Sequence, residues 1–272
     1  MREGLQMKVD TLAVLLVLAF NAKASLINLG TAAPFAVLGE AGVTNTGPSM
    51  IFGSVAGSSG TPAVTGFPPG QVISPGVLFV AGVGNAGPGT PFGDTTAAYN
   101  TAIGLSALNE GTASLGAGGI LSLGPGIYKF TSTTVLLNGL LQLDAMGSNS
   151  AEWVFQIPFA LTTASASIVQ VVNTGSAGPF DGSITWAVGS NAILGTTTTF
   201  LGTIISNSAG DQLQNGATIG CGRVISLTAS VTLDSNVIQT GCQATSSGSV
   251  PEPCTFAFLS VGMMVVWLKR RR

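Results

Sequence analysis

Charged side chains, on which most protein chemistry depends, are scarce in this chain of 272 residues. They make up 7% of the sequence, and there is no histidine. Between residues 25 and 250 the basic residues are Lys129 and Arg223, against eight acidic ones. Binding to nucleic acid needs clustered Lys and Arg side chains that displace counterions from phosphates. The composition therefore argues against nucleic acid as a partner.

A hydrolytic site is the first chemistry to weigh. The repeat described below predicts a β-solenoid, and many parallel β-solenoids cleave acidic polysaccharides. That reaction needs paired carboxylates or a base, with help from a cation. Asp144, Glu152 and Asp181 are the acids that folding would have to bring together. With two isolated cations and no histidine such a site is hard to assemble. We predict that the chain is not an enzyme and uses no metal or cofactor.

Two cysteines outside the C-terminal tail offer redox chemistry. Cys221 and Cys242 are 21 residues apart, which is close to the repeat period described next. Stacking of coils would bring them together, and an oxidising compartment would let a disulfide persist. The disulfide is our prediction, and two free buried thiols are the alternative.

A repeat of about 20 residues organises the C-terminal half. The segment 202–206 (GTIIS) returns at 222–226 (GRVIS), and a second register runs through Leu194, Leu213 and Leu233. A short polar stretch follows each of these leucines. A period near 20 with one apolar strand per register is typical of a β-solenoid, because each coil must bury its inner face against the next.

The rest of the chain predicts the elements that surround these repeats. Apolar residues that alternate with small polar ones indicate short strands, at 35–38, 126–130, 140–143, 153–157, 168–172 and 184–188. Residues 44–48 are predicted to form a turn, and 49–93, rich in Gly, Pro and Ser, a capping subdomain. Asp94 is a good N-cap, and Ala98, Ala102 and Leu105 share one face, which predicts a helix over about 94–109.

Both ends of the chain resemble address signals. Lys8, an apolar run and Ala22-Lys23-Ala24 predict a signal peptide over residues 1–24, with a buried strand or helix as the alternative. The mature domain would then span residues 25–249.

Residues 250–272 carry Pro251-Glu252-Pro253, an apolar stretch and a final Arg cluster. This tail resembles the PEP-CTERM sorting signal of Gram-negative bacteria, on which a membrane enzyme acts. A plain membrane anchor is the alternative. We expect a secreted or cell-surface protein of a Gram-negative bacterium.

Residues 29–242 resemble the ice-binding protein family of bacteria and fungi built on the DUF3494 domain. The matching stretches, in the family's order, are 29–32, 35–38, 43–48, 65–70, 98–99, 125–128, 143–144, 152–156, 186–190, 216–219, 222–223 and 231–234. The resemblance implies a mainly β fold: a right-handed, triangular β-solenoid with one long α-helix packed alongside and an N-terminal capping subdomain. It also implies an exported protein that adsorbs to ice, and we expect a monomer.

Short polar side chains in the repeat are the candidate ice-binding residues. Stacked strands lie about 4.8 Å apart, and residues on one face recur about every 6.7 Å along a strand. Small hydroxyls and methyls at those points form a rigid lattice that orders water. The predicted site consists of Thr163, Ser165, Thr196, Thr198, Thr199, Asn215, Thr218 and Thr232. One alternative is that threonine is frequent only because it favours strands. The alternative function is that of a cell-surface adhesin or matrix protein.

Overall fold

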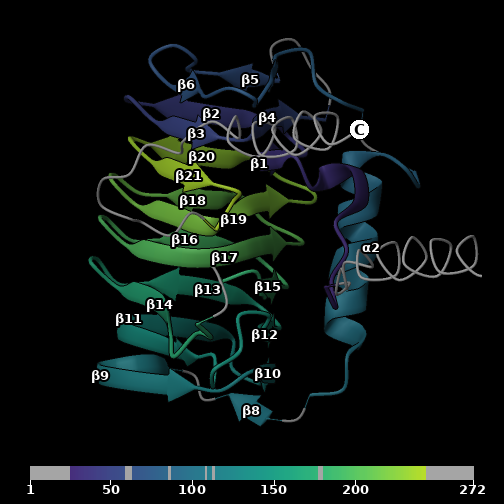
Figure 1. The fold of residues 1–272 in the computed structure, drawn as a ribbon. Helices are drawn as coiled ribbons and strands as arrows, with labels where there is room; N and C mark the ends of the chain where they lie inside the picture. Colours follow the sequence, from purple (N-terminus) through teal and green to yellow (C-terminus); the bar gives the residue numbers. More distant parts are fainter. Residues whose placement is uncertain are drawn as a thin grey trace, which may run out of the picture. The chain divides into compact units, whose positions relative to one another are not determined.

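A computed structural model of the chain describes residues 25–58, 63–84, 87–107, 109–111, 114–176 and 180–242. The predicted signal peptide and the sorting tail lie outside these residues. Figure 1 shows coils of strands stacked on one another with a helix along one side. The strands of neighbouring coils pair in parallel. This arrangement confirms the predicted β-solenoid.

The first of three faces, which we call the helix face, is covered on its outside by α2 (Pro91–Gly104). Outward side chains such as Val154, Ala187 and Ile205 form a second apolar cluster with Phe92 and Ala98 of the helix, so the part of this face under α2 is shielded from water. Its strands, in stacking order, are β8 (Asn109–Gly111), β10 (Gly126–Phe130), β12 (Glu152–Ile157), β15 (Ser183–Val188), the second halves of β17 (Thr199–Ser206) and β19 (Thr218–Ser226), β1 (Phe35–Gly39), β4 (Ser54–Gly57) and β7 (Leu78–Phe79).

The second face, called the threonine face, is open on its outside. Leu194, Leu213 and Leu233 occupy one register on it and point into the core, as their spacing predicts. Its strands are the first halves of β9 (Ser114–Leu123) and β11 (Thr134–Asp144), then β13 (Ala160–Thr163), β16 (Ala192–Leu194), β18 (Asp211–Leu213), β20 (Val231–Asp234), β2 (Val43–Thr46) and β5 (Val64–Thr65).

The third face, called the apolar face, carries several large outward hydrophobic side chains. Its strands are the second halves of β9 and β11, β14 (Ile168–Val172), the first halves of β17 and β19, β21 (Val237–Gln239), β3 (Met50–Phe52) and β6 (Gln71–Val72). β17 and β19 each continue round a corner, so one strand serves two faces.

Stacked aromatic rings fill the centre of the solenoid. The rings of Phe155 and Trp186, on neighbouring coils, lie 3.9 Å apart between centroids at an interplanar angle of 12°. Phe200 follows, with its centroid 5.0 Å from that of Trp186. The indole N–H of Trp186 donates to the carbonyl of Leu201 at 3.0 Å, so the one polar atom of this ring is satisfied.

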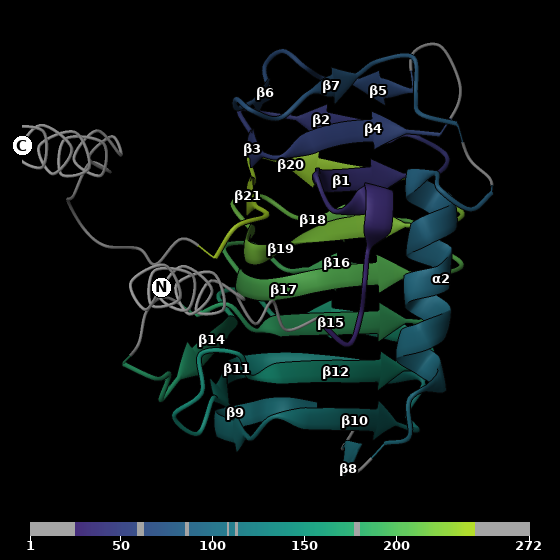
Figure 2. The same cartoon turned by 45° about the vertical axis from the view of Figure 1, so that its right-hand side comes forward.

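The N-terminal strands stack on the C-terminal coil. β1 pairs with β19, so that Val37 lies opposite Val224, and β2 pairs with β20. The first strands therefore extend the upper end of the solenoid, and α2 carries the chain from β7 at that end back to β8 at the other (Figure 2). Its 14 residues span about 21 Å.

The structure corrects three predicted boundaries. The helix begins earlier than 94, because Pro91 fits the first helical position and the Thr90 hydroxyl accepts a hydrogen bond from the N–H of Gly93. It ends at Gly104 rather than near 109. Residues 44–46 lie in strand β2 and not in a turn.

Within the segment predicted as a cap, 49–93, the described residues form short strands in coil register at the upper end, β3 to β7, and the last three residues begin α2. A 3-10 turn, η1 (Gly30–Ala32), packs beside α2. No helix within the described residues has both the length and the apolar character needed to cross a membrane.

Candidate functional site

The eight predicted site residues do not share one face. Thr232 lies on the threonine face and is exposed, whereas Thr199 and Thr218 are neighbours on the apolar face. The remaining five lie at the corner between these two faces. Of those five, Ser165, Thr196 and Asn215 point outward, and Thr163 and Thr198 point inward.

The two inward threonines stabilise the corner turns. Thr163 is 4% exposed and Thr198 is 0% exposed, and their hydroxyl oxygens lie 2.8 Å apart. Thr163 Oγ1 also accepts from the N–H of Gly195 at 2.8 Å, and Thr198 Oγ1 donates to the carbonyl of Ala164 at 3.2 Å. Buried polar groups need such partners. The structure therefore removes Thr163 and Thr198 from any surface site.

The outward corner residues form a second series, exposed or half-buried, that we call the corner ladder: Ser165, Thr196, Asn215 and Asp234. Thr196 Oγ1 donates to Ser165 Oγ at 2.8 Å, and Asn215 Nδ2 donates to Asp234 Oδ1 at 3.2 Å. The N–H of Gly216 donates to the carbonyl of Asp234, so the backbone ladder continues round the corner. The polar groups are thereby held in place by their neighbours.

A column of seven outward side chains runs along the threonine face from β11 to β5. From one end these are Leu136, Thr162, Ile193, Gln212, Thr232, Thr44 and Thr65, one from each successive strand. None is charged. Each pair is in continuous register, without the bulges that interrupt the ladders between β9 and β11 and between β17 and β19. The column is therefore straight.

Sequence reasoning found Thr232 in this column but missed Thr44, Thr65 and Thr162. The alternation in 43–46 was the available signal, because Val43 and Asn45 are buried and Thr44 and Thr46 are exposed. In the structure Thr65 Oγ1 donates to Thr44 Oγ1 at 3.4 Å. The two hydroxyls therefore continue the column on the upper coils, outside the 20-residue repeat.

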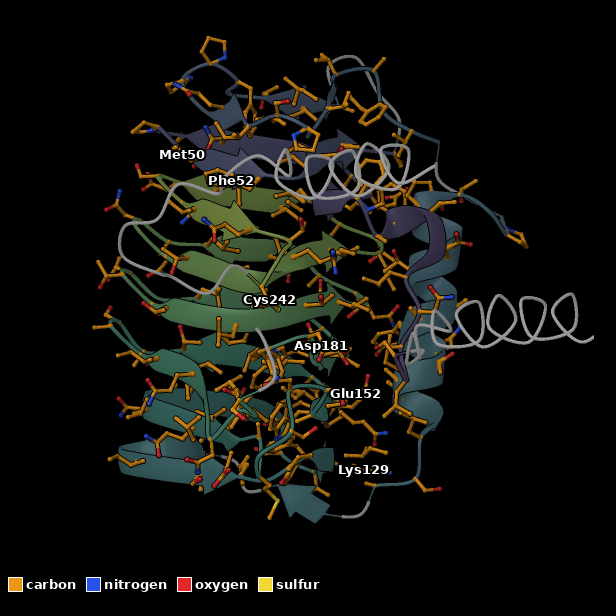
Figure 3. All side chains as sticks on the ribbon, in the orientation of Figure 1. Met50, Phe52, Lys129, Glu152, Asp181 and Cys242 are labelled. Atoms are coloured by element: carbon orange, nitrogen blue, oxygen red, sulfur yellow. The ribbon has the colours of Figure 1, made fainter. Side chains whose placement is uncertain are left out.

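The apolar face is less uniform. Its outward column places Ile120, which is 69% exposed, and Ile168 on one side of Thr199 and Thr218. Val237 and Met50, which is 42% exposed, follow on the other side. Figure 3 labels Met50 and Phe52 at the upper end of this face. Long, flexible side chains such as Met50 present no fixed lattice.

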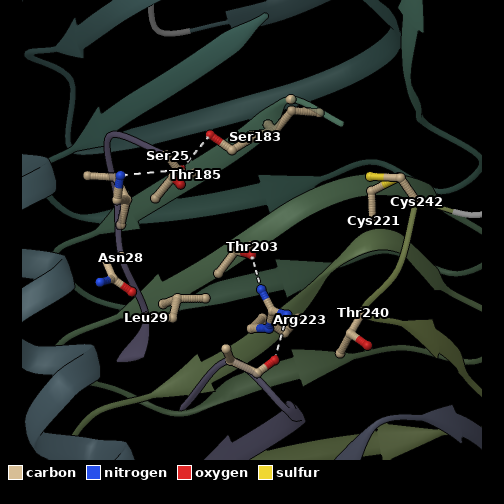
Figure 4. Close-up of a pocket in the computed structure, with 14 residues that line it drawn as sticks. Ser25, Asn28, Leu29, Ser183, Thr185, Thr203, Cys221, Arg223, Thr240 and Cys242 are labelled. Carbon is tan, nitrogen blue, oxygen red and sulfur yellow. Dashed lines mark hydrogen bonds between the residues drawn. The ribbon is translucent and has the colours of Figure 1, made fainter. Parts of the chain in front are cut away.

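A cavity of about 440 Å³ opens beside the helix face, where Arg223 and the two cysteines meet (Figure 4). Burial lowers the pKa of Arg223 to about 10. Cys221 and Cys242 are unbonded thiols that lie side by side. Cys221 donates a hydrogen bond to Cys242, which raises the pKa of Cys221 and lowers that of Cys242.

In the described part of the chain, no three His, Cys, Asp or Glu side chains are grouped closely enough to hold a metal ion. The arrangement is that of a β-solenoid whose open faces carry its repeated polar groups.

The chain belongs to the Ice-binding-like family, whose model matches residues 37–239. It is 38% identical to an ice-binding protein of Nostoc sp. (strain HG1), over 92% of this chain and 91% of that protein. An ice-binding protein of Flavobacterium frigoris (strain PS1) is 36% identical over 78% of this chain and 76% of its own length. The crystal structure of an ice-binding protein from Antarctomyces psychrotrophicus superposes with a TM-score of 0.66 at 33% identity, covering 80% of this chain and 99% of that one.

Proposed function

We propose that this protein binds ice through the threonine face and the adjoining corner ladder. The observation that carries the proposal is the straight, uncharged column from Leu136 to Thr65. Two ice-binding proteins that align with 92% and 78% of this chain support the activity itself. The helix face is covered by α2, and the apolar face is less regular.

The physical basis is a regular array in which four of the seven outward side chains are short threonines. Strand pairing sets neighbours in the column about 4.8 Å apart. Threonine is stiff about χ1 because its side chain branches at Cβ, so each methyl and hydroxyl keeps its position. Hydrogen bonds such as that from Thr196 to Ser165 fix the corner hydroxyls in the same way. Water held over such an array matches an ice surface at many points at once.

Bulky substitutions on the two open faces test the site. Thr232→Tyr and Thr44→Tyr place a large ring in the column without entering the core, so thermal hysteresis and inhibition of recrystallisation should fall sharply while circular dichroism stays unchanged. Thr199→Tyr and Thr218→Tyr on the apolar face are the matched controls and should retain activity. The reverse pattern would move the site to the apolar face.

The competing function is that of a cell-surface adhesin or matrix protein, which low charge and export also permit. Observation of crystal shape on a cold stage separates the two. Purified protein that neither shapes ice crystals nor inhibits recrystallisation at micromolar concentration would favour the adhesin. We further propose a non-enzymatic, monomeric protein, supported by the scarcity of charged groups and by relatives that are ice-binding proteins.

We also propose export with processing at both ends, to the medium or the surface of a Gram-negative bacterium. The sequence patterns at 1–24 and 250–272 support it, and a membrane sorting enzyme would be the partner of the tail. Peptide mapping of protein from the native host should find neither Leu15 nor Trp267. Recovery of an intact tail in the membrane fraction would favour a retained anchor.

A further inference from the structure

The N-terminal strap, which we define as residues 25–33, runs along the outside of the helix face beside α2 (Figure 2). Arg223 holds one end, since its Nη2 donates to the carbonyl of Ala33 at 2.9 Å and its Nε to that of Phe35 at 3.0 Å. The other end reaches Glu152. The N–H of Leu26 faces both carboxylate oxygens of Glu152, at 3.4 and 3.3 Å.

Glu152 accepts further hydrogen bonds, and the donors among the described residues are uncharged. Ser183 Oγ donates to Glu152 Oε1 at 3.1 Å, and Ser25 Oγ donates to Ser183 Oγ at 3.1 Å. Lys129, on the neighbouring strand β10, is labelled below Glu152 in Figure 3. It pairs with Gln156 of β12, which lies four residues after Glu152 in that strand. Within the described residues, the hydrogen bonds to this carboxylate therefore come from neutral groups.

We propose that Glu152 is the binding site for the α-ammonium group created when the chain is cut between Ala24 and Ser25. Hydrolysis of that peptide bond by a signal peptidase consumes water and leaves a carboxylate on Ala24 and an ammonium on Ser25. In the uncut chain the same nitrogen is a neutral amide. The inference rests on the proposed processing after Ala24 and is independent of the ice-binding face.

The geometry places the new charge close to its partner. Consecutive Cα atoms are about 3.8 Å apart, so the nitrogen of Ser25 lies one residue from a Leu26 N–H that already faces Glu152. The Ser25 hydroxyl, bonded to Ser183, keeps this residue against the strand. Cleavage would thus give the strap a charged contact at its free end, in addition to the Arg223 contact at the other.

The titration of the amine tests the proposal. Processed protein is purified from an exporting host, its first residue is mapped, and the pKa of the α-amino group is followed by NMR after ¹³C-methylation of amines. An exposed α-amino group titrates near pH 7.7–8.0, and we expect the native value to lie higher by about 0.2 to 0.7 unit. Because the ammonium gains a partner on folding, the resulting stability is present at neutral pH and lost as the pH rises through the native pKa.

Two variants complete the test. Glu152→Gln keeps the hydrogen-bond acceptor and removes the charge, so the shift should vanish. Asp144→Asn removes an acid elsewhere, on β11, and should leave the shift intact. Equal α-amino pKa values in the wild-type and Glu152→Gln proteins would overturn the proposal, as would a mature protein that begins at a residue other than Ser25. Ice activity should be the same in all three proteins, because Glu152 is remote from the threonine face.

Discussion

The hydroxyls of Thr163 and Thr198 lie 2.8 Å apart inside the solenoid, on neighbouring coils at the corner between its two open faces. The pair links the corner turns of two neighbouring coils. Thr163 Oγ1 also accepts a hydrogen bond from the backbone N–H of Gly195, where the partner in the ladder is a side chain. Residues that look like part of a surface array in the sequence therefore have a structural role.

Replacing Thr163 by Val should destabilise the fold without changing ice activity per folded molecule. The substitution keeps the shape but leaves the N–H of Gly195 and the Thr198 hydroxyl short of a partner, at a cost of about 1–3 kcal/mol. Urea denaturation measures the loss. Thr162→Val, the same change one residue earlier and on the outward side, is the control and should stay within about 0.5 kcal/mol. Equal stabilities would show that the hydroxyl pair contributes nothing.

Asp211 should make stability depend on pH. Its carboxyl is fully buried, which raises its pKa to about 7, although Ser206 Oγ and the N–H of Ala192 both donate to it at 2.7 Å. Because the folded pKa lies above the unfolded one, the folded state binds the extra proton between about pH 4 and 7. Stability should therefore fall as the pH rises across that window, by up to about 1.4 kcal/mol per pH unit.

Thermal unfolding at a series of pH values provides the measurement. Asp211→Asn should flatten the slope between pH 4 and 7 while retaining hydrogen-bonding capacity towards Ser206 and Ala192. Asp144→Asn should leave the slope as it is in the wild-type protein. A wild-type protein whose stability rises between pH 4 and 7 would contradict the prediction.

Cys221 and Cys242 should form a disulfide in the exported protein. They already lie side by side, and the bridge would close a loop of about 20 residues around β20 and β21. A loop of that size stabilises the fold by about 3 kcal/mol. Alkylation before reduction, followed by mass spectrometry, should find neither thiol labelled, and dithiothreitol should lower the unfolding temperature. Two alkylated cysteines in native protein would exclude the bridge.

Gln156 should anchor the helix to the solenoid. Its side chain is 6% exposed, and Nε2 donates to the carbonyls of Ala102 and Leu105, both at 2.8 Å, at the C-terminal end of α2. Gln156→Met preserves length but leaves both carbonyls without this donor, which should cost about 1–3 kcal/mol and speed amide exchange in the last helical turn. Gln142→Met, on the apolar face, is the control and should change neither quantity.

Much of the scaffold follows from local pattern. The strands Gly126–Phe130 and Ile168–Val172 match the predicted bounds, because apolar alternation with a period of two depends on near neighbours alone. The repeat places Leu194, Leu213 and Leu233 in one register for the same reason. The predicted helix start, Asp94, is three residues late, because Thr90 and not Asp94 caps the helix. The Asp94 carboxylate instead accepts hydrogen bonds from the N–H and hydroxyl of Thr31 and from the N–H of Gly89.

The face that a residue occupies could not be deduced in the same way. Thr198 and Thr199 are adjacent, yet the first is buried at a corner and the second is exposed on the apolar face. Successive side chains on a strand point to opposite sides, and each corner turn resets this alternation, so the assignment depends on where each turn falls. The sequence pattern identified short polar groups in register, and the turns distribute them over two faces and the interior.

By itself the sequence determined the solenoid period, the strands that build it and the scarcity of charge that limits its chemistry, because these depend on composition and on short-range spacing. Tertiary structure alone decided that the first strands stack on the last coil, as in the pairing of Thr44 with Thr232 across 188 positions of sequence. That contact brings Thr44 and Thr65 into the column begun by the repeat. No local period encodes it, because it joins segments that meet only when the whole core closes.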